Sequence, residues 1–167
     1  MDRASQDRFI EAWGQMGSLW GINPSTARVH ALLMASGGAL GLDDISRRLK
    51  ISRGNASMSL KELRNWGVVR KVKMPGDRRD YYETEPDVWK MFFAILRERK
   101  RREFDPLLEA VRAILSSARG DAGPPEKRFR QMAELLGALD MISARLLSDE
   151  AEARSILGFL SGKGNAV

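Results

Sequence analysis

The stretch over residues 42–84 constrains the fold more than any other, because its caps and turn residues permit only one order of elements. Asp43 or Asp44 is expected to cap a helix of about two turns. Ser52 is expected to cap a second helix over residues 53–66, with small and apolar residues on one face and polar and cationic residues on the other. The pattern therefore predicts two consecutive helices joined by a short turn.

The residues after the second helix have the pattern of a β-hairpin. Gly67 ends the helix, and residues 68–74 alternate in polarity and carry β-branched side chains, which is typical of a strand. Residues 75–80 supply turn chemistry, and residues 81–84 are expected to form the returning strand. Two helices followed by a hairpin are the order of a winged helix-turn-helix, in which the hairpin is the wing.

Two helices are expected before this stretch. Residues 8–20 place aromatic and apolar side chains on one face of a helix. Asn23 is a good cap and Pro24 suits the first position of a helix, so a further helix is predicted from Pro24 to about Ala35. Residues 39–42 are interpreted as a short apolar bridge to the stretch described above.

The residues after position 86 predict further helices. Pro106 either starts a new helix behind Asp105 or kinks the one that precedes it. The expected elements are a helical region over 86–118, a loop over 120–125 and helices over 126–147 and 149–160.

The predicted fold class is mainly α with a small β-hairpin wing, a winged helix-turn-helix with additional N- and C-terminal dimerisation helices. The domains expected are an N-terminal amphipathic helix over 1–23, the DNA-binding winged helix over 24–86, and a helical region over 87–167 for dimerisation and effector sensing. A winged helix of about 60 residues cannot bury the apolar faces of all the flanking helices, so we expect those helices to pack against a second copy of the chain. Packing within one chain is the alternative.

Positive charge is concentrated in one segment. The whole chain has a formal net charge of +6, whereas residues 47–79 alone carry eleven cations against two anions. Such a surface is typical of one that neutralises DNA phosphates. A solvated basic face is the alternative.

The second helix and the wing supply the residues expected to bind DNA. In a helix-turn-helix, the N-terminal part of the second helix lies against base edges in the major groove. The Asn55 side chain suits adenine, and that of Arg53 suits guanine or a phosphate. The alternative is that Ser52 only caps the helix and that Asn55 only forms hydrogen bonds within the turn. An arginine on a narrow hairpin tip suits the minor groove, and Asp77 is spaced to hold Arg79 in place by a charge-assisted hydrogen bond. The alternative is a turn in which the arginines have no binding role. The candidate residues are Ser52, Arg53, Gly54, Asn55, Ser57, Met58, Lys61, Arg64, Lys73, Asp77, Arg78 and Arg79.

The sequence resembles the GbsR-like branch of the MarR-type winged helix-turn-helix transcriptional regulators. The resemblance covers about residues 8–118 and rests on the segments 42–49, 52–60, 63–69 and 75–82. It implies a sequence-specific regulator, a repressor, that binds a two-fold operator as a homodimer. It also implies that Arg79 is similar to the wing arginine of the family and Asp77 to its orienting acid. The family usually has Leu-Thr soon after that arginine, and Glu83-Thr84-Glu85 stands here instead, so we expect the junction of the wing and the long helix to differ.

Some members of this branch sense a quaternary ammonium compound, which an aromatic cage holds by cation–π attraction. One interpretation of the aromatic residues is therefore a cage near the junction of the winged helix and the helices that flank it. The other is an ordinary apolar core. The residues concerned are Trp13, Trp20, Trp66, Tyr81, Tyr82 and Trp89.

Several other classes of function are disfavoured by the residues and motifs that the sequence lacks. There is no cysteine, which excludes disulfides, thiolate metal sites and a cysteine nucleophile. His30 is the single histidine and lies on an apolar helix, without a carboxylate pair, a phosphate-binding loop or metal-ligand spacing, so no enzyme, metal or cofactor is expected. No apolar run reaches membrane-spanning length and no signal peptide is recognisable, so we expect a cytoplasmic protein without a membrane partner. A winged-helix adaptor for proteins remains the rival class, although it would not need so basic a face.

Overall fold

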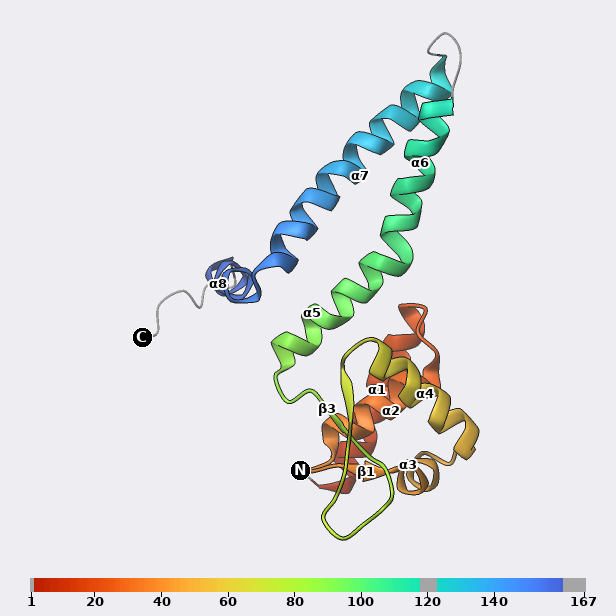
Figure 1. The fold of residues 1–167 in the computed structure, drawn as a ribbon, viewed down its shortest axis with the longest axis vertical. Helices are drawn as coiled ribbons and strands as arrows, with labels where there is room; N and C mark the ends of the chain where they lie inside the picture. The colour runs from red at the N-terminus through yellow and green to blue at the C-terminus, as the bar shows by residue number, and fades with distance from the viewer. Residues whose placement is uncertain (1, 118–122, 161–167) are drawn as a thin grey trace. The chain divides into compact units, whose positions relative to one another are not determined.

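The computed structural model describes residues 2–117 and 123–160 and divides the chain into two compact units, Met1–Met91 and Phe92–Val167. We call the first unit the head. Its elements are α1 (Arg3–Leu19), α2 (Pro24–Ala35), β1 (Leu40–Gly41), α3 (Leu42–Leu49), α4 (Arg53–Asn65), β2 (Val69–Val72) and β3 (Tyr81–Thr84), as Figure 1 shows. The predicted fold class, a mainly helical winged helix-turn-helix, is confirmed.

Helix α1 packs closely on α2 through small residues. It begins at Arg3, earlier than predicted, because the Asp2 side chain accepts a hydrogen bond from the backbone N–H of Ser5 and caps it. A Cβ atom added to Gly17 would lie 2.5 Å from the Cβ atom of Ala27, which is closer than two carbon atoms can approach. The two helices therefore touch almost backbone to backbone at Gly17.

The start of α3 differs from the prediction. Gly41, rather than Asp43 or Asp44, is the N-cap, and it makes no side-chain capping bond. The reason is that Gly41 already pairs with Tyr81 in a sheet, so the chain passes directly from a strand into the helix. The two aspartates lie in the first turn of the helix, where negative charge interacts favourably with the helix dipole.

The wing belongs to a three-stranded antiparallel sheet with the order β1-β3-β2. Strand β3 pairs with β2 from Val72↔Tyr81 to Val69↔Thr84, which confirms the predicted hairpin, although β2 ends before Met74. The interpretation of residues 39–42 as a bridge is incomplete, because β1 pairs with the other edge of β3.

Helix α4 matches its prediction closely. The Ser52 side chain accepts a hydrogen bond from the backbone N–H of Asn55 at 3.1 Å and caps the helix. Gly67 adopts a φ of 74°, a left-handed conformation that favours glycine and ends the helix. The buried residues of the helix are Ala56, Ser59, Leu60 and Leu63, which form the face predicted to be buried.

The remaining elements are α5 (Val88–Arg99), a π-helical turn η1 (Lys100–Phe104), α6 (Asp105–Ser117), α7 (Pro124–Ser148) and α8 (Glu150–Leu160). Pro106 neither splits the helix nor ends it, since the helical path continues from η1 into α6. Proline has no N–H and its ring crowds the carbonyl group four residues earlier, and the wider π turn accommodates both effects.

Helices α6 and α7 lie side by side (Figure 1) around a small core. Leu108 and Val111 of α6 and Leu136 of α7 are buried there. Helix α7 starts at Pro124, so the end of the predicted loop over 120–125 is helical, while residues 120–122 lie outside the described residues. No helix in the described part of the chain is long and apolar enough to cross a bilayer.

Candidate nucleic-acid interface

The polar face of α4 is exposed over its whole length. Met58 is 74% exposed, and Arg53 is held by a salt bridge of 3.0 Å to Asp43 of α3. Lys61 and Arg64 make no ion pair within the described residues, so both cations are available to an anionic partner. The exposed candidates on this helix and its cap are Ser52, Arg53, Gly54, Ser57, Met58, Lys61 and Arg64.

Asn55 differs from its neighbours because it is half-buried. Its side-chain amide donates a hydrogen bond to the Ser25 hydroxyl of α2 at 3.0 Å. This bond uses one of the two amide hydrogens, and it ties the start of α4 to the start of α2. Ser25 was not predicted to take part, because the contact joins residues far apart in the sequence.

Buried polar contacts fix α4 on α2 further along the helix. The Thr26 hydroxyl donates to the Glu62 carboxylate at 2.9 Å and lies 3.3 Å from the Ser59 hydroxyl. Thr26 and Ser59 are almost fully buried. Since buried polar groups need partners, these contacts favour one position of α4 relative to α2.

The wing holds a cluster of three side chains, Asp77, Arg79 and Tyr81, which we call the wing-tip cluster. Asp77 accepts hydrogen bonds from the backbone N–H of Arg79 at 2.8 Å and from its guanidinium at 2.6 Å. The Tyr81 hydroxyl donates to Asp77 at 2.8 Å and accepts from Arg79 at 2.7 Å, and the Tyr81 ring centroid lies 5.4 Å from the guanidinium carbon.

These contacts shift the pKa values of the three side chains. Hydrogen bonds from Arg79 hold the pKa of Asp77 well below its ordinary value, and the same carboxylate raises the pKa of Arg79. The hydrogen bond to Asp77 also raises the pKa of Tyr81. The cluster therefore keeps its ion pair over the physiological range, with the arginine fixed in one orientation.

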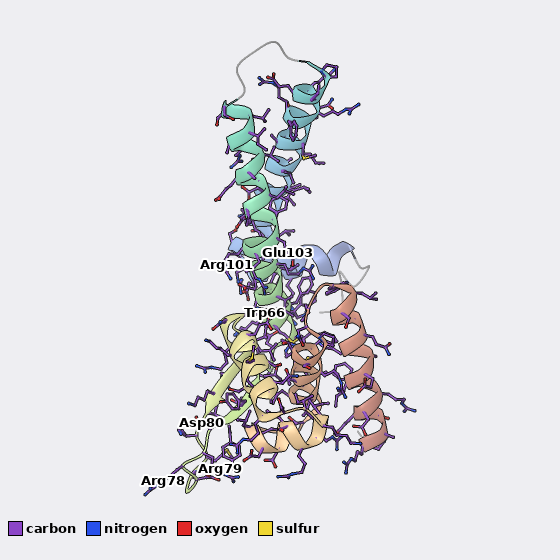
Figure 2. The ribbon with its side chains drawn as sticks, turned by 90° about the vertical axis from the view of Figure 1, so that its right-hand side faces the viewer. Trp66, Arg78, Arg79, Asp80, Arg101 and Glu103 are labelled. Carbon is purple, nitrogen blue, oxygen red and sulfur yellow. The ribbon has the colours of Figure 1, made fainter. Side chains whose placement is uncertain are left out.

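The tip of the wing carries a further cation, Arg78. Asp80 accepts from Lys71 and Lys73 of the β2 side at 2.6 Å each, and these bonds lower its pKa. The Lys73 ammonium also donates to the backbone carbonyl of Arg78 at 3.0 Å and braces the loop. Arg78 makes no ion pair among the described residues, and Figure 2 shows it at the outer end of the wing beside Arg79 and Asp80.

The six aromatic residues considered for a cage occupy different parts of the chain. The Trp13 ring lies 6.1 Å from the His30 ring, between α1 and α2, and Tyr81 belongs to the wing-tip cluster. Trp66 is the C-cap of α4, and Figure 2 shows it at the opposite end of the head from the wing tip. Trp20 is 50% exposed directly after α1, Tyr82 pairs with Leu40, and Trp89 is in the first turn of α5. A cage therefore stays a prediction.

His30 is a core residue. It is 3% exposed, and burial lowers its pKa from 6.5 to about 4. Its Nε2 atom lies 3.3 Å from the Thr84 hydroxyl, which itself donates to the Val68 carbonyl group. No group of three acidic or histidine side chains that could hold a metal occurs in the part of the chain described by the structure.

Comparison with known proteins agrees with this geometry. Residues 20–80 match the sequence model of the MarR family. The matched segment runs from the end of α1 to the loop of the wing. Over 91 residues the chain is 24% identical to the putative HTH-type transcriptional regulator YvaV of Bacillus subtilis (strain 168), and the match covers 54% of this chain and 51% of YvaV. The chain thus matches about half the length of that relative.

Two solved structures are similar to this chain. A crystal structure of a transcriptional regulator has a TM-score of 0.71 at 23% identity, covering 89% of this chain and 99% of the other, and the two chains share the same fold. A mutant of S. aureus MepR, bound to an oligodeoxyribonucleotide, has a TM-score of 0.41 at 16% identity, covering 83% of this chain and 91% of that one.

Proposed function

We propose that this protein is a transcriptional regulator that binds double-stranded DNA through α4 and the wing. The wing-tip cluster is the observation that carries the proposal. Asp77 and Tyr81 hold Arg79 in place before any partner arrives, so little side-chain freedom is lost on binding. A fixed arginine on a narrow projection suits the negative potential of the minor groove.

Helix α4 supplies the major-groove contacts in this proposal. Its exposed face presents Ser57 and Met58 to base edges, while Lys61 and Arg64 lie further along it and bind phosphates. Arg53 exchanges its salt bridge to Asp43 for guanine or a phosphate, an exchange of one exposed ionic contact for another that costs little.

A second copy of the chain completes the proposed regulator. Helix α7 exposes Met132, Leu135, Leu139 and Ile142, whose spacing of three and four residues is that of a coiled-coil seam. Apolar residues exposed in a row on a helix usually pack against a partner. A two-fold homodimer would place two copies of α4 on successive turns of an operator, and the prediction that α1 contributes to the dimer is part of this proposal.

We further assign the protein to the GbsR-like branch, as a repressor in the cytoplasm, on the resemblance of the four sequence segments given above. An effector held by aromatic residues belongs to the same proposal. The rival function is a winged-helix adaptor that binds proteins, and salt dependence separates the two, since phosphate contacts release counterions and protein contacts do not.

A mobility-shift titration on the DNA upstream of the gene, at two salt concentrations, tests DNA binding. Arg79→Ala is expected to weaken affinity about 10-fold and to reduce the salt dependence, with an unchanged thermal midpoint. Lys127→Gln removes one exposed cation from α7 and serves as the matched control. Equal affinity of the Arg79→Ala variant and the control at physiological salt would refute the role of the wing. Binding that is insensitive to salt in the unmodified protein would favour the adaptor.

A further inference from the structure

Gly54 lies in the first turn of α4, at a position where the fold would accept a larger residue. Among the described glycines, those with a positive φ are Gly21, Gly67 and Gly76, so the backbone at position 54 does not require a glycine. Outside the adjoining residues and the helix backbone, the nearest described atom to a Cβ atom added at Gly54 is the Ser52 Oγ atom, at 3.9 Å. Glycine destabilises a helix relative to alanine, and one common reason to find it there is the close approach of a ligand.

The side chain that follows Gly54 is held from the side of α2. Asn55 is half-buried, and its amide donates a hydrogen bond at 3.0 Å to the Ser25 hydroxyl, which belongs to a half-buried residue as well. This bond uses one amide hydrogen and leaves the second hydrogen and the Oδ1 atom, for which the described part of the chain shows no partner. Because Ser25 and Asn55 belong to different helices whose packing is fixed by buried contacts, the bond restricts the rotation of the amide.

The free groups of the Asn55 amide match the edge of adenine in the major groove. Adenine presents N7 as an acceptor and the N6 amino group as a donor, and an asparagine amide in the right orientation contacts both. Guanine presents two acceptors, N7 and O6, so an amide held in that orientation would place its Oδ1 atom against O6. An amide that is free to rotate can avoid this contact by turning its NH2 group towards guanine. The bond from Asn55 to Ser25 therefore favours adenine over guanine.

We propose that Gly54, Asn55 and Ser25 act together to select adenine at one position of the bound DNA. Gly54 lets the edge of the base approach α4, Asn55 contacts that edge, and Ser25 is a positioning residue that orients the amide. This inference rests on the proposed function, since it concerns the choice of base by α4. Its failure would leave DNA binding by the wing and by the cations of α4 in place.

Selection by the full chain from a pool of duplex DNA with a randomised core identifies the preferred sequence. Mobility-shift titrations then compare that sequence with variants in which one adenine is replaced by guanine. We expect one position at which adenine is preferred about tenfold and at which Asn55→Ala loses the preference. Ser25→Ala should lower the preference about threefold at that position alone, whereas Ser25→Thr keeps the hydroxyl and should retain it. Ser116→Ala is the matched control and should change nothing, because the Ser116 hydroxyl is exposed on α6 and donates to the Ala113 carbonyl group of the same helix.

Gly54→Ala tests the approach of the base separately. It should raise the Tm of the free protein, because alanine favours the helix and its Cβ atom meets no close contact among the described residues. The same variant should lower the affinity for the selected DNA about tenfold, since the added Cβ atom occupies the space that the base needs. Gly137→Ala of α7, where the nearest atom to the added Cβ atom is also 3.9 Å away, is the matched control and should leave DNA affinity unchanged.

The inference is overturned if Ser25→Ala keeps the full preference for adenine, or if Gly54→Ala binds DNA as tightly as the unmodified protein. A loss of affinity in Ser25→Ala that is equal for every sequence would also overturn it, because Ser25 would then have a structural role alone. In each of these cases the unmodified protein still binds DNA, and the proposed function stands. Failure of the unmodified protein to bind any duplex from the pool would instead refute the proposed function and the inference together.

Discussion

Lowering the pH from 7 to 5 is expected to destabilise the protein through one buried side chain, His30. Its folded pKa is about 4, because burial disfavours the charged imidazolium, whereas the unfolded chain has an ordinary value near 6.5. The unfolded state therefore takes up a proton first as the pH falls. The stabilising contribution is complete above pH 6.5 and is lost progressively as the pH falls towards 4.

The size of the loss follows from proton linkage between these two pKa values. Integrated from pH 7 to pH 5, the free energy of unfolding falls by about 2 kcal/mol. The chain contains no other histidine. The pKa values of Asp77 and Asp80 are lowered by their cationic partners, so their titration weakens the wing only at pH values below this window. The change between pH 7 and 5 can thus be attributed to His30.

Urea unfolding at pH 7, 6 and 5, followed by circular dichroism, measures this loss. His30→Gln keeps a hydrogen-bonding group near the Thr84 hydroxyl but cannot titrate, so its free energy of unfolding should vary little over the same range. An NMR titration of the folded protein gives a second measurement, in which the imidazole signals should not shift between pH 7 and 5. A histidine that titrates near 6.5 in the folded state would refute the reasoning, as would an equal pH dependence in the variant.

Three further substitutions probe other contacts. Gly17→Ala places a Cβ atom 2.5 Å from that of Ala27 and should lower the free energy of unfolding by about 2 kcal/mol. Gly137→Ala of α7 has no neighbouring atom closer than 3.9 Å to the added Cβ atom, so an equal loss in urea unfolding would contradict the tight contact between helices. Tyr81→Phe keeps the ring but removes two hydrogen bonds of the wing-tip cluster, and DNA affinity in mobility-shift assays should fall about threefold. Leu135→Gln should reduce the dimer fraction in analytical ultracentrifugation at unchanged helix content, and a variant as dimeric as the unmodified protein would exclude the exposed face of α7 as the interface.

The features predicted correctly from the sequence are those determined by near neighbours. Ser52 caps α4 through a residue three positions away, and Asn23 caps α2 through one two positions away. The spacing of small and apolar residues in a helix likewise determines which face is buried, as Leu60 and Leu63 show. Each of these features depends on a few consecutive residues, so the sequence alone specifies it.

The features that were missed depend on contacts between distant residues. Strand β1 has only two residues, too few to show alternation, and it forms because β3 offers an edge to Gly41. That pairing also moves the start of α3 to a residue without a capping side chain. The hydrogen bond between Asn55 and Ser25 could not be foreseen for the same reason. Tyr81 was considered only as a cage residue, although it begins β3 two positions after Arg79, where a local contact with the tip of the wing can be expected.

The total charge of residues 47–79 and the charge left without an ion pair differ, and only the structure separates the two. The excess of cations over residues 47–79 overstates the positive potential of the head, because most of those side chains pair with acids outside that window. Asp80 neutralises Lys71 and Lys73, and Glu83 pairs with Arg70. Within the described residues, the cations of this window without an ion pair are Lys50, Lys61, Arg64 and Arg78. They lie at the C-cap of α3, on the exposed face of α4 and at the tip of the wing, and so the unpaired charge, rather than the total, indicates where an anionic partner is expected to bind.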